Sequence, residues 1–363
     1  MFTAPTTAAL VPLGARVERL LGDPSTLTSG VWAEVGARLG AAGPEAAELI
    51  AAAGAADGGK HLRPRIVAAS YLAHGGDEPA LLRRVAGAQQ LVHLALCIHD
   101  DLIDGDVVRH GRPNVVGRTA TAARTRGLGG TEAARLAEAS GLLAGDLALS
   151  AALMALVTAP APDAVRVRLA AAALAAIEWA IAGELLDVRG ETLPPEHSTP
   201  LRVAALKTAS YSVTLPLLLG AIAAGADDEA TAGAIDEVGT ALGIAYQLGD
   251  DDLGLFGDPA TTGKSALSDL RDGKRTEHIR LALERADDAD RARIAQTLGS
   301  PDATDADARR VREIVTATGA RAAVHELIEA HLERGLDAAR TGLPAELADH
   351  LDELALALRH RTR

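Results

Sequence analysis

Apolar residues recur along this chain at the three- and four-residue spacing of an α-helix, and no stretch alternates cleanly between apolar and polar residues. Val31, Val35 and Leu39 are an example. Hydrophobic residues make up 48% of the chain, but they include only two Trp, three Tyr and two Phe, so Ala, Leu and Val must supply most of the buried surface. Such a composition favours helices over sheets. The pattern predicts an all-α fold with closely packed small side chains.

Pro and Gly residues separate the helical segments, as at Gly43-Pro44 and Gly75-Gly76, and divide the 363 residues into ten or more helices. We find no repeat of fixed period and no linker of domain-separating composition. The chain is therefore expected to form one helical domain over residues 29–363, preceded by a loosely attached leader over residues 1–28.

The net charge and the cysteine content limit which partners the protein is expected to bind and in which cell compartment it is expected to lie. The net charge of −13 argues against a broad surface that binds nucleic acid. The single cysteine, Cys97, is consistent with a reducing compartment and is expected in the core, as is Trp179. The longest apolar runs, residues 169–182 and 214–225, are broken by Glu178 or too short to span a bilayer. These features predict a cytoplasmic protein with no transmembrane segment and no nucleic-acid partner.

Two clusters of aspartates follow apolar helical segments. Residues 91–99 are apolar almost all round and run into Asp100, Asp101 and Asp104, of which Asp100 and Asp104 lie one helical turn apart. A second cluster, residues 250–252, follows the apolar run 241–248. Taken alone, each cluster is also consistent with a solvated helix end or a helix cap. Two of them facing each other across a bundle predict a site for several Mg²⁺ ions.

Basic residues accompany both clusters. Lys60 and Arg63 follow a Gly pair, while the segment 109–112 (Arg-His-Gly-Arg) comes directly after the first cluster. Lys207 interrupts an apolar segment, and Lys264 and Lys274 lie beyond the second cluster. A lone basic residue near acids is usually a surface ion pair. Together, these basic residues suggest that the site binds diphosphate.

The order and spacing of these segments resemble the trans-isoprenyl diphosphate synthase (polyprenyl synthetase) family, and bacterial geranylgeranyl diphosphate synthases above all. The matching segments are Gly-Gly-Lys-His-Leu-Arg-Pro at 58–64, His-Asp-Asp-Leu-Ile-Asp at 99–104, Arg-His-Gly-Arg-Pro at 109–113, Gly-Asp-Leu-Ala-Leu at 145–149, Gly-Glu-Leu-Leu-Asp at 183–187, Lys-Thr-Ala at 207–209, Tyr-Gln-Leu-Gly-Asp-Asp at 246–251 and Gly-Lys at 263–264. The resemblance implies a single-domain helical bundle around a deep central cavity, usually assembled as a homodimer.

The resemblance also implies a role for individual residues. Three Mg²⁺ ions would be held on an allylic diphosphate by Asp100, Asp104 and Asp250, with Asp101 and Asp251 completing the two motifs. By the same resemblance, the allylic diphosphate is contacted by Arg109, Lys207 and Lys264. Isopentenyl diphosphate is contacted by Lys60, Arg63, His93 and the residue at position 110. Thr208 and Gln247 lie near the reacting carbons.

Four positions depart from the family pattern. His110 stands where a second Arg is usual, and imidazole is only partly protonated near pH 7. Gly254 stands where the second motif often has a third Asp, for which Asp252 or Asp258 are candidate substitutes. Gln90 and Ser265 replace the commoner Glu and Pro.

The function implied is a chain-elongating prenyltransferase that joins isopentenyl diphosphate to an allylic diphosphate by ionisation, condensation and elimination. Ala95 and Leu96 lie five and four residues before Asp100, where short-product members commonly carry a bulky aromatic residue. Geranylgeranyl diphosphate is therefore the expected main product, with longer chains second and farnesyl diphosphate third. The alternatives are a class I terpene cyclase, which needs no second substrate, and a non-catalytic synthase subunit, which would be expected to lose its aspartates.

Overall fold

The chain is helical over nearly all of the residues that the structure, a computed structural model, describes: 11–109, 111–193, 197–257 and 266–361. Among these residues the α-helices are α1 (Leu13–Leu21), α2 (Ser29–Leu39), α3 (Pro44–Gly54), α4 (Leu62–Ala73), α5 (Pro79–Ile103), α6 (Val115–Thr125), α7 (Gly130–Val157), α8 (Asp163–Thr192), α9 (Pro200–Val203), α10 (Leu215–Ala224), α11 (Glu229–Phe256), α13 (Ala266–Arg271), α14 (Glu277–Arg285), α15 (Asp288–Thr297), α16 (Asp305–Ala317), α17 (Ala320–Gly342) and α18 (Ala345–Arg361). A π-helical segment, η4 (Ala204–Thr214), joins α9 to α10. Two short strands, β1 (Val108–Arg109) and β2 (Arg112–Pro113), form a hairpin after α5.

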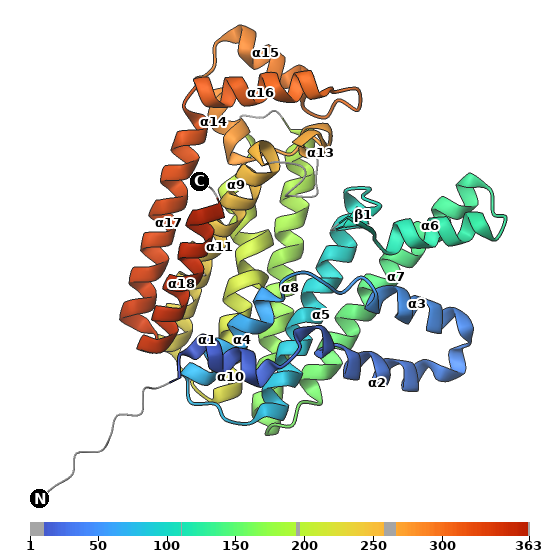
Figure 1. The fold of residues 1–363 in the computed structure, drawn as a ribbon, viewed down its shortest axis with the longest axis vertical. Helices are drawn as coiled ribbons and strands as arrows, with labels where there is room; N and C mark the ends of the chain where they lie inside the picture. The colour runs from blue at the N-terminus through green and yellow to red at the C-terminus, as the bar shows by residue number, and fades with distance from the viewer. Residues whose placement is uncertain (1–10, 110, 194–196, 258–265, 362–363) are drawn as a thin grey trace, which may run out of the picture.

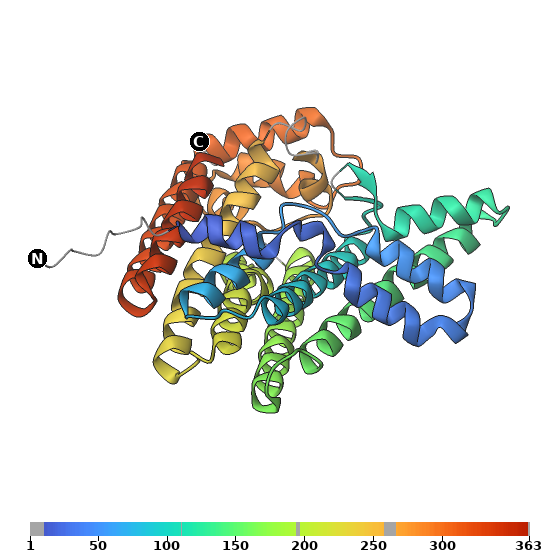
Figure 2. The same cartoon turned by 60° about the horizontal axis from the view of Figure 1, so that its bottom comes forward.

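The long helices form a bundle whose centre holds the candidate site. In this bundle α5 packs against α7, while α8 and α11 both pack against η4, and α11 also packs against α17. Figure 1 shows α13 to α16 covering one end of the bundle, and α2, α3 and α6 projecting to one side. The tilted view in Figure 2 shows α7 and α8 on the side of the bundle that lies at the back of Figure 1. The single-domain all-α architecture expected from the sequence is confirmed.

Small residues allow the central helices to approach closely. A Cβ at Gly183 on α8 would lie 2.2 Å from the backbone nitrogen of Lys207 on η4. A Cβ at Gly243 on α11 would lie 2.3 Å from the Cβ of Ala209 on the same segment. Both separations are far below van der Waals contact, so only glycine fits at these crossings. The two glycines thereby bring α8, η4 and α11, which carry much of the site, into direct backbone contact.

The described part of the expected leader is packed on the domain. Helix α1 buries Leu13, Val17 and Leu21 and contacts α4, α5 and α18. Leu27 is also buried. The apolar spacing of Leu13, Val17 and Leu21 is itself the helical signal, since these residues lie on one face of a helix. The packed domain therefore includes residues 13–28, which the sequence reading had assigned to a loosely attached leader.

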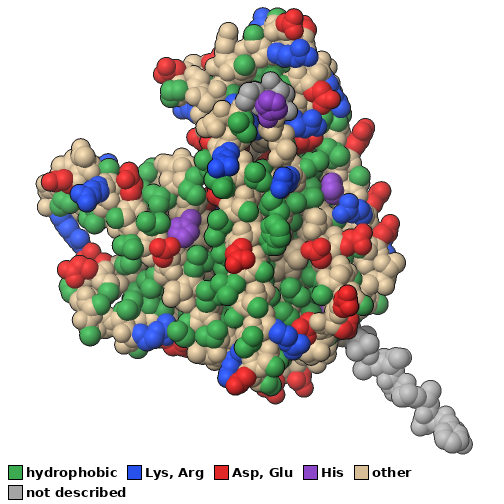
Figure 3. Space-filling view, turned by 180° about the vertical axis from the view of Figure 1, so that it is seen from behind, with side chains coloured by type: hydrophobic (Ala, Val, Ile, Leu, Met, Phe, Trp, Pro, Cys, Tyr) green, Lys and Arg blue, Asp and Glu red, His purple; other side chains and the backbone are tan. Residues whose placement is uncertain are grey.

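Helices α7 and α8 keep much of their apolar surface exposed. Trp179 is 57% exposed, which corrects its assignment to the core, and Leu143 and Ile181 are similarly exposed. Figure 3 shows hydrophobic side chains gathered over the middle of this side of the molecule. Judged only by length and composition, α7, α8 and the run Pro200–Ala224 are each long and apolar enough to cross a membrane. The sequence reading, which used the length of unbroken apolar runs, had found no such segment.

Candidate active site

The first aspartate cluster ends α5, and its carboxylates meet Arg109 on strand β1. Arg109 Nη2 lies 2.9 Å from Asp100 Oδ2, and Arg109 Nε lies 2.7 Å from Asp101 Oδ1. The hairpin pairs Arg109 with Arg112 and so turns the chain back beside the end of α5. Asp101 is only 3% exposed, with Asn114 as a second hydrogen-bond donor. Arg109, from the basic segment after the first cluster, therefore folds onto that cluster, as its sequence position suggested.

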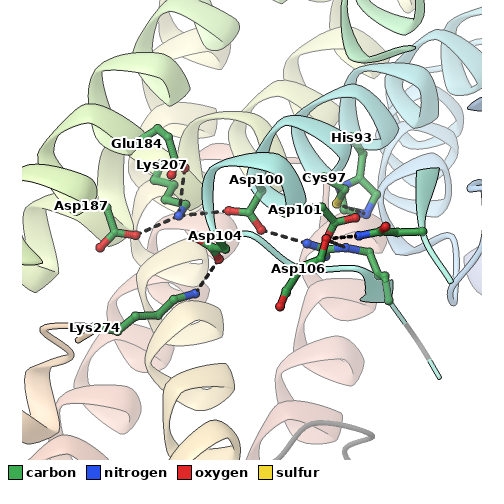
Figure 4. A network of polar contacts seen from close by, with 12 residues as sticks. His93, Cys97, Asp100, Asp101, Asp104, Asp106, Glu184, Asp187, Lys207 and Lys274 are labelled. Atoms are coloured by element: carbon green, nitrogen blue, oxygen red, sulfur yellow. Dashed lines mark hydrogen bonds and ion pairs between the residues drawn. The ribbon is translucent and has the colours of Figure 1, made fainter. Parts of the chain in front are cut away.

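Lys207 reaches the same cluster from η4. Its Nζ lies 3.2 Å from Asp100 Oδ1, 2.8 Å from Glu184 Oε2 and 2.8 Å from Asp187 Oδ2. Figure 4 shows these three acids, from α5 and α8, surrounding the ammonium group. The π-helical turn carries Lys207 and Thr208, and such turns frequently occur at functional sites.

Lys274, in the turn between α13 and α14, closes the site from the far side. Its Nζ lies 3.0 Å from Asp104 Oδ2, and Figure 4 shows it pointing at Asp104 across from Lys207. One carboxylate oxygen from each of Asp100, Asp104 and Glu184 lies within 4.8 Å of the others. Carboxylate oxygens are the ligands that Mg²⁺ prefers. Asp100 and Asp104, two of the three residues that the family resemblance assigned to metal, are thus close enough to share an ion with Glu184.

The charges of this cluster shift the pKa values of its members. Burial alone would raise the pKa of Asp100, but Lys207, Arg109 and Lys274 outweigh it and lower that pKa to about 2. Burial opposes a charge on Lys207 too, yet the carboxylates around it raise its pKa. Burial raises the pKa of Asp101 even beside Arg109. At Glu191, burial and the charges of Asp187 and Asp104 raise the pKa to about 7. The site therefore carries more acidic than basic groups, as a cation site requires.

The second cluster lies in the last two turns of α11, and its side chains contact different partners. Asp251 Oδ1 accepts a hydrogen bond of 2.7 Å from Gln247 Nε2, and Gln247 Oε1 accepts one of 2.5 Å from Thr208. Burial and the charges of Asp269, Asp187 and Asp250 raise the pKa of Asp251 to about 7. The hydrogen bonds therefore join Thr208 and Gln247, which the sequence placed near the reacting carbons, to the second aspartate motif.

Asp252 points to a different set of partners. Its carboxylate is 2% exposed and lies 3.1 Å from His278 Nε2 on α14, with Arg321 Nε at 3.0 Å and His325 Nε2 at 3.2 Å on α17. Arg321 also stacks over the ring of Phe256 at 3.9 Å. Burial opposes the charge on Asp252, but these partners lower its pKa. This corrects the expectation that Asp252 replaces the third acid of the motif, because its carboxylate is already bound by α14 and α17.

Arg63 and His93, both assigned to isopentenyl diphosphate, lie together. Arg63 Nη1 is 3.2 Å from His93 Nε2, and its other nitrogens donate to Ser212 Oγ at 2.7 and 3.2 Å. The Arg63 guanidinium lies 5.2 Å from the Tyr211 ring, which stacks with His93. Cys97, expected in the core, is half-buried with its Sγ 3.5 Å from His93 Nδ1. These contacts hold the Arg63 guanidinium against His93 on α5.

Some of the other predicted residues lie in the part of the chain that the structure describes, and the rest lie outside it. Lys60 is exposed on the loop before α4, Leu96 is half-buried and Ala95 is fully buried on α5. Asp250 lies at the end of α11 beside Asp251. His110 and Lys264, as well as Asp258 and Ser265, lie outside the residues that the structure describes.

Sequence reasoning missed several residues of the site. Glu184 and Asp187 were given no role beyond their place in the matching segment 183–187, and both bind Lys207. Their signal was an acid pair at i and i+3 on an otherwise apolar helix, which places both side chains on one face. Tyr211 and Ser212 follow Lys207 and Thr208 by one turn of η4, and that spacing could have found them.

The comparisons with known proteins agree with this geometry. The model of the family described as Polyprenyl synthetase matches residues 46–315. A geranylgeranyl diphosphate synthase of Mycobacterium tuberculosis is 33% identical over 79% of this chain and 77% of its own, and a (2E,6E)-farnesyl diphosphate synthase of the same species is 31% identical over 82% and 78%. The crystal structure of geranylgeranyl pyrophosphate synthase from Corynebacterium glutamicum, complexed with isoprenyl diphosphate and magnesium, superposes with a TM-score of 0.85, at 29% identity over 96% of this chain and 98% of that one.

Proposed function

The chain belongs to the polyprenyl synthetase family and is a chain-elongating isoprenyl diphosphate synthase, and we propose that its main product is geranylgeranyl diphosphate. The observation that carries the product length is the pair Ala95 and Leu96 on α5, one turn before the first cluster, where neither side chain is a bulky aromatic. Leu96 is half-buried, so it lies at a surface that a growing chain can reach. A geranylgeranyl diphosphate synthase and a farnesyl diphosphate synthase match this chain to a similar degree. Longer chains and farnesyl diphosphate are therefore the alternative products.

We propose that Asp100, Asp104 and Asp250 hold three Mg²⁺ ions on the diphosphate of the allylic substrate. The close approach of the Asp100, Asp104 and Glu184 oxygens supports this assignment, as does the excess of acidic groups around them. The relative from C. glutamicum contains magnesium. When bound, Mg²⁺ supplies positive charge that stabilises the leaving diphosphate.

The basic residues divide between two diphosphates in this proposal. Arg109, Lys207 and Lys264 bind the allylic diphosphate, and the ion pairs of Arg109 and Lys207 with Asp100 support the placement of these two. The isopentenyl diphosphate is bound by Lys60, Arg63, His93 and His110. The contact between Arg63 and His93 supports this second assignment.

The reaction follows from this arrangement of charge. The C–O bond of the allylic substrate breaks, and its electron pair leaves with the diphosphate, whose charge Arg109 and Lys207 offset. The double bond of isopentenyl diphosphate then attacks the allylic cation and forms the new C–C bond. Thr208 and Gln247, fixed by their mutual hydrogen bond, line the reacting carbons. The released diphosphate takes the proton lost from the condensed product, so no protein nucleophile is needed.

Two alternative activities predict a different site. A class I terpene cyclase has no need of a second diphosphate site, whereas Lys60, Arg63 and His93 are all present. A non-catalytic subunit would be expected to lose its aspartates. Both clusters of this chain keep theirs, except that glycine stands at position 254 in place of the third acid of the second motif. Both observations favour a chain-elongating synthase.

The experiment that tests the product is incubation of the protein with Mg²⁺, isopentenyl diphosphate and, in turn, dimethylallyl, geranyl or farnesyl diphosphate. We expect a twenty-carbon product from each primer. A product that stops at fifteen carbons, or that exceeds twenty carbons with every primer, contradicts the proposed length. Formation of a cyclic hydrocarbon from one allylic diphosphate alone supports the cyclase instead.

We further propose that the protein is a cytoplasmic homodimer joined through the exposed apolar face of α7 and α8. Leu136, Leu143 and Val157 on α7, together with Val167, Trp179 and Ile181 on α8, give this face a large contiguous apolar surface. A monomer rarely leaves such a surface in water. A second copy of the chain presents the same face, so a two-fold contact would bury both.

Light scattering during gel filtration tests the dimer. Leu143→Glu, at a residue 54% exposed on α7, should yield a monomer, whereas the control Leu356→Glu, at a residue 52% exposed on α18, should not. A wild-type monomer contradicts the proposal. Flotation of the wild-type protein with lipid vesicles would show that the face binds a membrane instead.

A further inference from the structure

The loop between α3 and α4 carries Lys60, a residue assigned to isopentenyl diphosphate. Lys60 is exposed and follows Gly58 and Gly59, which are exposed too and have no side chain to pack. Gly59 has a φ of +84°, where glycine is favoured. The loop borders a cavity of about 350 Å³ between α2 and α3, whose lining includes Asp57 and His61. Polar contacts rather than close packing must therefore fix the position of Lys60.

Asp57, at the start of this loop, is held by two other parts of the chain. Its Oδ2 accepts a hydrogen bond of 2.8 Å from Oγ1 of Thr28, the residue before α2. Its Oδ1 accepts one of 2.7 Å from Nε2 of Gln90 on α5. Thr28 and Gln90 are 3% and 1% exposed, and the side chain of Asp57 is 8% exposed. A buried carboxylate with two donors is a strong anchor, because hydrogen bonds to a charged group are stronger than those between neutral groups.

The same carboxylate also reaches His61 at the far end of the loop. His61 Nε2 lies 3.7 Å from Asp57 Oδ1, within ion-pair distance. His61 has a φ of +50° and is the only non-glycine residue with a positive φ in the described part of the chain. A residue with a Cβ keeps this conformation only where the surrounding contacts enforce it. Asp57 therefore holds both ends of the loop, before and after Lys60.

Helix α5 holds the segment around Lys60 at two points. Gln90 binds Asp57, three residues before Lys60. His93 lies three residues further along α5, and its Nε2 is 3.2 Å from Nη1 of Arg63, three residues after Lys60. Residues three apart are neighbours on the surface of a helix. Lys60 thus lies between two attachments to adjacent positions of α5, and its place depends on both.

We propose that Asp57 is a positioning residue for isopentenyl diphosphate, which acts without touching the substrate by fixing the loop that carries Lys60. This inference rests on the proposed function, because the assignment of Lys60 to isopentenyl diphosphate belongs to that proposal. The amide of Gln90, which stands where Glu is commoner, fits this role, because a second carboxylate would repel that of Asp57.

Steady-state kinetics of Asp57→Ala, with each substrate varied in turn, test the proposal. We expect the KM for isopentenyl diphosphate to rise about tenfold through misplacement of Lys60, and the allylic KM and kcat per folded molecule to stay within about twofold of wild type. Asp227→Ala is the matched control, because the Asp227 side chain is 12% exposed and has Arg168 as an ion-pair partner at 2.8 Å. It should lower the free energy of unfolding in urea and leave both KM values unchanged.

A double-mutant cycle with Lys60 separates positioning from a general structural role. Lys60→Ala alone should raise the KM for isopentenyl diphosphate. Adding Asp57→Ala to Lys60→Ala should then raise it by no more than about twofold, because no ammonium group is left to misplace. A full further rise of about tenfold in the Lys60→Ala background means that Asp57 does not act through Lys60, and overturns the proposal.

An exchange of acid and amide tests the same contact without removing it. Gln90→Glu sets a carboxylate against that of Asp57 and should raise the KM for isopentenyl diphosphate. Combining it with Asp57→Asn restores the pair, because the new amide donates to the new carboxylate while its oxygen still accepts from Thr28. The double variant should therefore return to within about twofold of the wild-type KM. Circular dichroism establishes that each variant is folded, and this exchange decides the question where Asp57→Ala does not fold.

The results separate this inference from the proposed function. Equal KM values for isopentenyl diphosphate in Asp57→Ala and Asp227→Ala overturn the role of Asp57, and so does an equal rise of both substrates' KM values in Asp57→Ala. A double exchange variant that is no better than Gln90→Glu overturns it too. A wild-type KM in Lys60→Ala instead overturns the proposed assignment of Lys60, and with it the inference.

Discussion

At the end of α5 each carboxylate of the first cluster has a basic side chain within ion-pair distance, whereas at the end of α11 Asp251 is held by the neutral amide of Gln247. The pKa values follow this difference. Three cations lower the pKa of Asp100 to about 2, while burial and neighbouring acids raise that of Asp251 to about 7. The carboxylates of the first cluster are therefore neutralised in part by basic side chains of the protein, whereas Asp251 in the second cluster is surrounded by further acids.

The two clusters also differ in how many of their acids face the site. Asp100 and Asp104 lie one turn apart and face the same side, since a helix repeats every 3.6 residues. Three consecutive acids at positions 250–252 must instead point in three directions about 100° apart. Asp252 is turned toward α14 and α17, where it joins helices rather than substrate. Similar sequence patterns thus serve catalysis at one helix end and, in part, stability at the other.

The largest effect is expected for Asp100→Ala. The variant loses a metal ligand while Lys207 keeps Glu184 and Asp187, and Arg109 keeps Asp101, so no buried cation is left alone. Turnover should fall by at least about 10³-fold, because charge on the leaving diphosphate is no longer stabilised. The free energy of unfolding should change by only about 1 kcal/mol. Steady-state kinetics and urea unfolding measure both, and near-normal turnover at saturating Mg²⁺ contradicts the assignment.

Asp252→Ala should produce the opposite pattern. Removing this carboxylate leaves His278 and Arg321 without their counterion, which should lower the free energy of unfolding by about 3 kcal/mol. Turnover per folded molecule should stay within about tenfold of wild type, because the site acids remain in place. His325→Ala is the control, since His325 is partly exposed and water replaces the lost contact. A stable Asp252→Ala variant that loses Mg²⁺-dependent diphosphate binding would place Asp252 in the site after all.

The third test concerns product length and two residues of α5. Leu96 lies about 40° around the helix from Asp100, whereas Ala95 lies about 140° away and is fully buried. Leu96→Phe should therefore shorten the main product to fifteen carbons without loss of stability. Ala95→Phe should shorten the product too but lower the free energy of unfolding by about 1–3 kcal/mol through overpacking.

Chromatography of the chains made from dimethylallyl and isopentenyl diphosphate gives the product length. Leu96→Ala is the matched variant in the opposite direction and should lengthen the product. An unchanged product distribution in both Leu96 variants means that the chain does not grow along this face of α5.

The helical fold could be predicted from the sequence, because helical periodicity is a local feature of the chain. The family resemblance assigned Arg109 and Lys207 to the diphosphate held at the first cluster, and in the structure both lie against Asp100. The sequence could not predict which way Asp252 turns, since that depends on His278 and Arg321, which lie far along the chain. Nor could it predict the exposure of Trp179, because an apolar side chain on the surface of a helix has the same local sequence pattern as one in the core. The approach of Asp269 to Gly254 is likewise set by how α13 packs on α11.

The smallest effect is expected at His110, which follows Arg109 in the sequence. Imidazole is only partly charged near pH 7, whereas a guanidinium is always charged. His110→Arg should therefore lower the KM for isopentenyl diphosphate by a factor of about three to ten, the equivalent of roughly 1 kcal/mol, and leave the KM for the allylic substrate unchanged. The advantage should grow between pH 6 and pH 8.5, because the wild-type imidazole loses its proton over this range and the guanidinium does not. Initial rates with each substrate varied in turn give both constants, and a change confined to the allylic KM would move His110 from the isopentenyl diphosphate site to the first cluster itself.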